Sequence, residues 1–294
     1  MSFNPAAPTL QDTWDWRAAA NFIGGGTGTG LLMVTLVAGL LGAPVFMPTL
    51  AGLVFVALGL SMVWLEIGRP LRALHVFFNP YTSWMTREAI VAMPLMLCGA
   101  LALWFQWIGL VVLLAVLAAV FLFCQGRILH ASRGIPVWRT PRIVPLILTT
   151  GLTEGAAFFL VLMPLLSTEA VAAAGRTVLV LLLALSVMRF GAWKSYRAGL
   201  EGDAPLAALQ VLRDADGIVA LLGGVAPAIL AATALAFTGY AIPLGVAAGA
   251  LAGFGGWYMK AIIITRASYN QGFAIDHSAA RGGGKPGPGT KPGW

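Results

Sequence analysis

The chain has 294 residues, of which 59% are hydrophobic and only 10% are charged. Soluble domains carry about 25% charged residues, so this chain has too little charge to cover the surface of a soluble globule. The composition excludes a soluble enzyme, a disordered chain and a disulfide scaffold, and it predicts an all-α polytopic membrane protein. The net charge of +7 does not indicate nucleic-acid binding, because the basic residues are spread over loops and a tail between apolar segments.

Eight apolar segments are long enough to cross a bilayer as helices. A hydrocarbon core about 30 Å thick needs about 20 apolar residues per spanning helix. The third and fourth segments are separated by little more than Gln106 and Trp107, and a single helix over both would be too long, so we expect a tight hairpin there. The predicted spans cover residues 18–41, 47–65, 89–105, 108–125, 144–166, 177–192, 218–237 and 241–264.

Lysine and arginine gather in the connections on one side of these spans. The opposite side carries only Glu169 and Arg176, whereas Lys260 is grouped with the basic residues of the C-terminal segment. Since Lys and Arg stay on the cytoplasmic side, both termini are predicted to be cytoplasmic. We expect a membrane domain over residues 1–266, with a short amphipathic interfacial helix at 197–217, and a flexible tail over residues 267–294.

The first span begins with the glycine-rich run NFIGGGTGTG. The pairs Gly24/Gly28 and Gly26/Gly30 have the spacing of small residues that let membrane helices approach closely. We therefore expect helix packing there. The alternative is a backbone that approaches a flat ligand, with Asn21 as a polar contact.

Acidic and basic residues flank the connection between the second and third spans. Glu66 ends one span and Glu88 opens the next, beside an apolar slot. Such a setting suits a quinone, which takes up two electrons and two protons and needs groups that donate and accept hydrogen bonds. Interfacial anchoring is the alternative, but anchoring uses Lys and Arg rather than Glu, so the carboxylates favour quinone chemistry. The cluster consists of Glu66, Arg69, Arg72, His75, Arg87 and Glu88.

Glu154 lies in the middle of the fifth span, in the run TTGLTEGAAFFL. An ionisable group at that depth is costly and is expected to face the bundle interior. It is either a proton relay or a structural glutamate, protonated or paired with Arg189. The rival function is a secondary transporter or proton-conducting protein that acts through Glu154. The paired Gly/Pro-broken helices of transporter sites are not evident, which favours the quinone interpretation.

Haem and metal ions are not expected in this chain. The three histidines are His75 in a loop, His130 at a span end and His277 in the tail, so no two of them lie inside spans at matching depth. The two cysteines, Cys98 and Cys124, cannot supply the four thiolates that an iron–sulfur cluster usually needs. Quinone chemistry in this chain is therefore expected to proceed without haem.

The run LEIGRPLRALHVFFNPYTSWMTREAI, residues 65–90, resembles the membrane-anchor subunits of the DMSO reductase (NrfD-like) family. The glycine-rich first span, the G-R-P-x-R turn and the S-x-x-x-R-E opening of the third span all fit. The opening WDWRAAANFIGGGTGTG and the closing ITRASYNQGFAIDH are most similar to the branch found in sulfite dehydrogenase and phenylacetyl-CoA oxidoreductase complexes.

This resemblance implies a quinone-interacting anchor in the bacterial inner membrane, with a molybdopterin catalytic subunit and an iron–sulfur electron-transfer subunit as partners. It implies exchangeable ubiquinone or menaquinone, and Glu88 falls where the family has a functional carboxylate. In related anchors a His precedes the turn, whereas Glu66 stands there in this chain. We expect Glu66 and Glu88 to exchange quinone protons, and Arg69, Arg72, His75, Arg87 and Asn21 to contact the quinone or the partner.

Overall fold

The computed structural model describes residues 7–66, 70–166 and 168–272. Eight helical segments of this part of the chain are long and apolar enough to cross a membrane. The described residues form no β-strand, and an isolated antiparallel bridge joins Leu10 to Tyr269. The all-α, eight-span prediction is therefore confirmed, and the fold is that of a multi-pass membrane protein.

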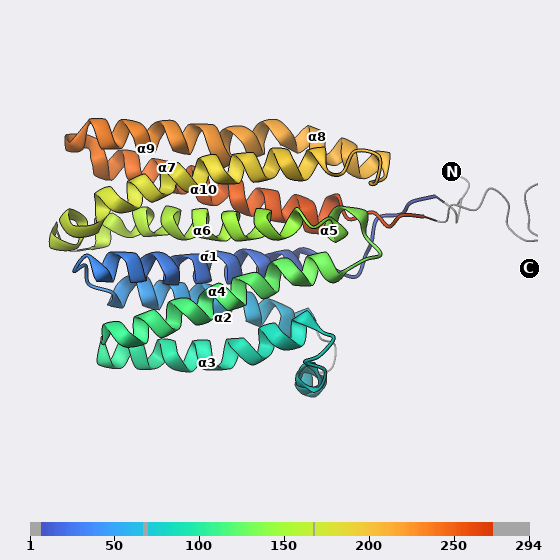
Figure 1. Cartoon of the computed structure of the whole chain (residues 1–294), viewed down its shortest axis with the longest axis horizontal. Coiled ribbons are helices and arrows are strands. Elements are labelled where there is room, and N and C mark those ends of the chain that lie inside the picture. Colours follow the sequence, from blue (N-terminus) through green and yellow to red (C-terminus); the bar gives the residue numbers. More distant parts are fainter. Residues whose placement is uncertain (1–6, 67–69, 167, 273–294) are drawn as a thin grey trace, which may run out of the picture.

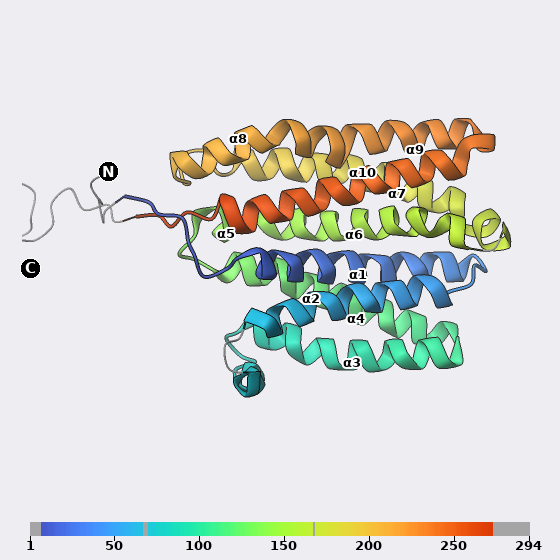
Figure 2. The same ribbon diagram turned by 180° about the vertical axis from the view of Figure 1, so that it is seen from behind.

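The helices form two groups that lie side by side along α1 and α6 (Figures 1 and 2). One group contains α1 to α4, and the other contains α6 to α10. The long helices are α1 (Trp16–Leu40), α2 (Phe46–Glu66), α3 (Trp84–Phe105), α4 (Ile108–Ala131), α6 (Ile143–Leu162), α7 (Thr168–Ala198), α8 (Leu206–Ala220), α9 (Ala226–Ala236) and α10 (Ala241–Ala261). The shorter elements are the 3-10 turns η1 (Pro70–Phe78), η2 (Met163–Leu165) and η4 (Thr238–Tyr240), the helix α5 (Pro136–Arg139), and the π-helical turns η3 (Leu221–Val225) and η5 (Ile262–Arg266).

The glycines of α1 allow this helix to pack closely against neighbours in both groups. A Cβ atom on Gly24 would lie 2.6 Å from the carbonyl oxygen of Phe55, and one on Gly28 would lie 2.5 Å from that of Gly52, both on α2. A Cβ atom on Gly30 would collide with the backbone of Gly151 on α6. The helix-packing interpretation of the glycine-rich run is therefore confirmed.

The third and fourth spans form the expected hairpin. Gln106 ends α3 in the left-handed region, with φ of 47°, and its N–H donates to the carbonyl of Ala102. Trp107 then adopts an extended backbone, and α4 begins at the next residue. One left-handed residue is thus enough to reverse the chain, which explains why so short a polar interruption separates two spans.

The larger part of the segment expected to form a separate interfacial helix, from Leu206 onward, belongs to the seventh span instead. α8 begins at Leu206 and runs through the π-helical turn η3 into α9, so the span covers Leu206–Ala236 rather than residues 218–237. The apolar residues Ala208, Leu212, Ala215 and Val219 of α8 are spaced by three or four positions and are buried against the bundle. The helix is amphipathic, but its apolar face packs on protein.

Both ends of the described chain lie at the same end of the bundle. The N–H of Asn270 donates to the carbonyl of Thr9 at 2.9 Å, beside the bridge between Leu10 and Tyr269. An even number of spans requires this arrangement. The side of the membrane on which this end lies stays a prediction.

Candidate functional site

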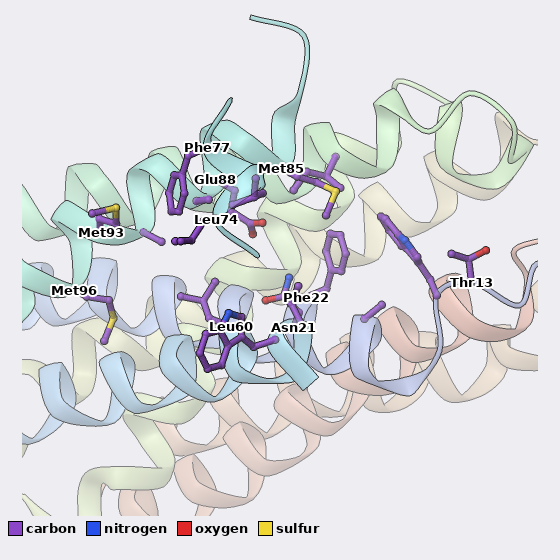
Figure 3. Close-up of a pocket in the computed structure, with 18 residues that line it drawn as sticks. Thr13, Asn21, Phe22, Leu60, Leu74, Phe77, Met85, Glu88, Met93 and Met96 are labelled. Atoms are coloured by element: carbon purple, nitrogen blue, oxygen red, sulfur yellow. The ribbon is translucent and has the colours of Figure 1, made fainter. Parts of the chain in front are cut away.

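A cavity of about 590 Å³ opens where α1, α2, α3 and η1 meet, at the end of the bundle that holds both chain ends (Figure 3). The start of α3 contributes one wall, and the segment that precedes α1 together with its first turns contributes another. Ligand pockets in proteins have volumes of about 300–1,000 Å³. This cavity therefore has room for a small molecule with a ring.

The wall of the cavity is almost entirely apolar, with several aromatic and methionine side chains. Aromatic rings supply flat contact surfaces, and methionine adapts its shape to irregular ligands. The apolar lining residues are Trp14, Ala18, Phe22, Leu60, Val63, Trp64, Leu74, Val76, Phe77, Met85, Ala89, Ala92, Met93, Met96 and Ile128.

Besides the exposed Thr13, two buried polar side chains interrupt this apolar wall. Glu88 of α3 and Asn21 of α1 are both buried, with exposed fractions of 7% and 5%, and they face the same space (Figure 3). Oε1 of Glu88 and Oδ1 of Asn21 have no hydrogen-bond partner among the described residues. A buried polar atom without a partner is costly, and both atoms are acceptors, so a hydroxyl group of a bound ligand could satisfy them by donating a hydrogen bond.

Gln125 of α4 links these two residues from behind the cavity. Its Nε2 donates to the carbonyl oxygen of Asn21 at 3.2 Å, and its side chain lies beside Glu88. Gly25 leaves the space that this amide occupies, since a Cβ atom there would collide with it. The glycine-rich run therefore also positions a polar side chain next to the candidate site.

Arg17 fixes the start of α1 against the end of α2 at the rim of the cavity. Its Nη1 donates to the carbonyl oxygen of Leu65 at 3.0 Å, and its guanidinium pairs with Asp15, the N-cap of α1. Hydrogen bonds from Arg17 hold the pKa of the Asp15 carboxyl below its usual range. These contacts anchor the first turn of α1. Asn21 lies on the next turn of the same helix.

The remaining residues of the predicted cluster do not contribute a described side chain to the cavity. His75 is exposed on η1, where its ring contacts Phe78 edge-on. Arg87 donates to the carbonyl oxygens of Pro80 at 2.8 Å and Tyr81 at 2.7 Å, and its guanidinium lies over Trp84. Arg69 lies outside the described residues, as do the side chains of Glu66 and Arg72.

Glu154 is fully buried, as expected, but its partner is Lys260 and not Arg189. Oε2 of Glu154 lies 2.7 Å from Nζ of Lys260, and neither side chain is exposed. The hydroxyl of Thr27 donates to the same oxygen at 2.9 Å, and Nε1 of Trp257 donates to that hydroxyl. Lys260 lies inside α10, so its assignment to the cytoplasmic charges of the C-terminal segment was wrong.

Arg189 is buried on α7 and binds backbone carbonyls. Its Nη1 donates to the carbonyl oxygen of Ala252 at 2.9 Å, and its Nη2 donates to that of Gly223 in the π-helical turn η3. Its guanidinium also lies near Gly256, as does the Glu154 carboxylate, since a Cβ atom on Gly256 would touch both. Arg189 therefore contributes positive charge near Glu154 without forming an ion pair with it.

Two residues of these sites, Gln125 and Lys260, were not predicted from the sequence. Lys260 gives a usable signal, because it is a charged residue inside the apolar run WYMKAIII, just as Glu154 is inside its own apolar run. Gln125 gives a weaker signal, since it was placed at the end of a predicted span. Only the packing of α4 on α1 shows that it faces Asn21 and Glu88.

The described residues contain no group of three or more His, Cys, Asp or Glu side chains placed to hold a metal ion. Cys98 and Cys124 are buried free thiols on α3 and α4. His130 lies at the end of α4, and His277 lies outside the described residues.

One curated protein resembles part of this chain. It is the C subunit of sulfite dehydrogenase from Allochromatium vinosum, with 30% identity over an alignment of 159 residues that covers 44% of this chain and 49% of that protein. The chain therefore spans about half the length of the curated relative that it matches. No family model matches the chain. The similarity loosely supports a membrane subunit of an oxidoreductase complex.

Proposed function

We propose that this chain is the quinone-reactive membrane subunit of an oxidoreductase complex, and that it binds quinone in the cavity between α1, α2, α3 and η1. The observation that carries the proposal is the pair of buried polar atoms, Oε1 of Glu88 and Oδ1 of Asn21, in an otherwise apolar cavity of about 590 Å³. The similarity to a sulfite dehydrogenase subunit supports a role in such a complex.

The residues present fit a quinone by shape and by polarity. A quinone supplies reversible two-electron, two-proton chemistry at two carbonyl groups on a flat apolar ring. Trp14, Phe22 and Phe77 line the cavity with rings that can pack on the faces of such a ligand and exclude water. The Nδ2 of Asn21 can donate to a quinone carbonyl, and its Oδ1 can accept from a hydroxyl of the reduced form.

Glu88 is the group that would hold the exchanged proton. A carboxyl group in a hydrogen-bonding position can give up and accept a proton as a ligand changes its charge. Gln125, which lies beside Glu88, cannot exchange protons in this way, but its amide can orient the carboxyl group. Glu66 stays a proposed second proton-exchanging residue. Arg69 and Arg72 stay proposed contacts of the quinone or the partner, whereas His75 and Arg87 do not line the cavity and stay proposed contacts of the partner.

The proposed partners are an iron–sulfur electron-transfer subunit and a molybdopterin catalytic subunit. The cavity lies at the end of the bundle that also carries Arg133, Arg139, Lys194 and Arg197. Basic residues at this end suit a cytoplasmic position in the bacterial inner membrane, and a partner docked there would lie near the cavity. Transport through Glu154 is the alternative, but the ion pair with Lys260 gives that carboxylate a structural partner.

The test uses the complex purified from its native host in mild detergent. Iron and molybdenum that co-purify with this chain establish the partners. Glu88→Gln keeps the shape of the side chain but removes proton exchange, so we expect quinone turnover to fall by about 100-fold or more, within the usual range for a proton-transferring group. Dye-linked activity of the partners should stay unchanged.

Glu201→Gln is the matched control, because Glu201 is an exposed carboxylate in the connection between α7 and α8. It should keep both activities. Wild-type quinone turnover in the Glu88→Gln complex would refute the role of Glu88. A metal-free protein from the native host would refute the proposed partners.

A further inference from the structure

A second cavity of about 600 Å³ lies at the same end of the bundle, where the start of α3 meets the end of α4 and α5. It shares no residue with the first cavity: Trp84 and Arg127 line this one, whereas the next residues along the chain, Met85 and Ile128, line the other. Most of its wall is polar. The main lining residues are Thr82, Trp84, Arg127, His130, Arg133 and Arg139.

The charges around this cavity do not balance. Arg139 pairs with Asp203, with 2.6 Å between Nη2 and Oδ1, and Arg139 also donates to Gln271. Neither Arg127 nor Arg133 has an ion pair with an acidic side chain of the described residues. Three guanidinium groups and one carboxylate leave an excess of two positive charges, and this excess favours an anion.

Arg127 is held in place toward this cavity. Its guanidinium lies 4.8 Å from the centre of the Trp84 ring, and Arg87 lies over the same ring at 4.1 Å. Its Nε is buried and has no hydrogen-bond partner among the described residues. The contact with the Trp84 ring positions the guanidinium at the wall of the cavity, and a guanidinium offers several N–H donors to an anionic oxygen.

An exposed apolar stripe on α4 leads to the cavity. Val112, Val116, Val120 and Phe123 are 40–55% exposed, and their spacing of three or four residues places them on one face of the helix. Arg127 and His130 continue this face with the same spacing. The ring of Phe123 contacts Trp84 edge-on at 5.7 Å. One helix face therefore runs from a lipid-exposed apolar surface into a basic pocket.

We propose that this cavity binds the headgroup of an anionic phospholipid. The phosphate would lie between Arg127 and Arg133, and the acyl chains would follow the stripe from Phe123 to Val112. Basic pockets between membrane helices are typical sites for such headgroups. A free phosphate ion would use the same arginines but not the stripe, and this difference separates the two sources. The proposal does not depend on the quinone site.

The experiment measures bound lipid on the intact purified complex by native mass spectrometry after exchange into mixed micelles. The micelles contain phosphatidylglycerol, which is anionic, or phosphatidylcholine, which is zwitterionic. We expect tighter binding of phosphatidylglycerol. Each arginine near a membrane surface contributes about 1 kcal/mol, which is about fivefold in affinity. Arg127→Gln/Arg133→Gln should therefore weaken that binding about 30-fold.

Arg213→Gln is the matched control, because Arg213 is an exposed arginine of α8, which lies at the far edge of the other helix group (Figure 1). It should bind phosphatidylglycerol as the wild type does. The single variant Arg133→Gln leaves the contact between Arg127 and Trp84 intact, because Arg133 is exposed and does not take part in it. It should weaken binding about fivefold.

Three results would overturn the proposal. The first is equal binding of both lipids by the wild type. The second is wild-type binding of phosphatidylglycerol by the double variant. The third is displacement of phosphatidylglycerol by millimolar inorganic phosphate, which would indicate a site for the free ion. If the double variant lost a partner subunit but kept its bound lipid, the proposal would also fail. The pocket would then bind an acidic surface of that partner.

Discussion

Glu154 of α6 and Lys260 of α10 form an ion pair of 2.7 Å that is fully shielded from solvent. Both residues also bind α1: Thr27 donates to Glu154, and Lys260 donates to the carbonyl oxygen of Phe22 at 2.9 Å. Gly26 leaves the space for the lysine, because a Cβ atom there would collide with Nζ. The pair therefore joins the two helix groups where α1 meets α6 and α10.

The first prediction concerns the stability of this junction. Removing one partner of a buried pair leaves an uncompensated polar group and costs about 3–5 kcal/mol, whereas neutralising both partners is often tolerated. We expect Lys260→Met to lower the melting temperature of the purified protein in detergent by several degrees. Glu154→Gln/Lys260→Met should recover most of that loss. A double variant as unstable as Lys260→Met would argue against a direct coupling between the two side chains.

The second prediction separates the structural role of Glu154 from a proton relay. Glu154→Gln/Lys260→Met retains the packing but removes both titratable groups. If the pair is structural, the complex in liposomes keeps wild-type quinone turnover and wild-type proton uptake, and we expect this result. Normal turnover with lost proton uptake, recorded with a dye inside the liposomes, would instead identify Glu154 as a relay.

The third prediction concerns the contact between α1 and α6. Gly30→Ala places a methyl group against the backbone of Gly151, and overpacking of this kind costs about 1–3 kcal/mol. We expect a lower melting temperature and a smaller yield of folded protein. Gly191→Ala on α7 is the control, because nothing lies within 4 Å of its added Cβ. Equal melting temperatures for the two variants would contradict this packing.

The fourth prediction fills the candidate quinone cavity. Ala92 is buried on α3 and lines the cavity, so Ala92→Phe should raise the KM for quinone at least about tenfold because the ring occupies ligand space. Dye-linked activity should not change. Ala100→Phe adds the same ring to an exposed position on the same helix and should leave the KM unaltered. An unchanged KM in the Ala92→Phe complex would place the quinone elsewhere.

The fifth prediction tests whether Arg87 acts on the ligand or on the loop before α3. Its hydrogen bonds to Pro80 and Tyr81 fix that loop. We expect Arg87→Gln to lower the melting temperature by a few degrees while the KM for quinone stays within about twofold, since Arg87 does not line the cavity. A tenfold rise in KM at an unchanged melting temperature would support direct contact with the quinone.

The sequence by itself determined the fold class, the number of spans and the helix-packing role of the first span. Apolar length decides which segments can cross a bilayer, and this property is local. The spacing of Gly24, Gly28 and Gly30 is local as well, so the amino-acid order alone reveals it. Glu88 was a candidate from the sequence because it is a carboxylate at the start of a span, and Asn21 was named as a polar contact in the alternative interpretation of the glycine-rich run.

The tertiary structure decided which distant residues meet. No local pattern pairs Glu154 with Lys260 across 106 positions, or places Gln125 between Asn21 and Glu88. The same holds for α8, whose polar residues suggested an interfacial helix although its apolar face packs on the bundle. Whether a side chain is buried depends on which neighbouring helix its own helix packs against. The packing of the whole bundle determines these neighbours.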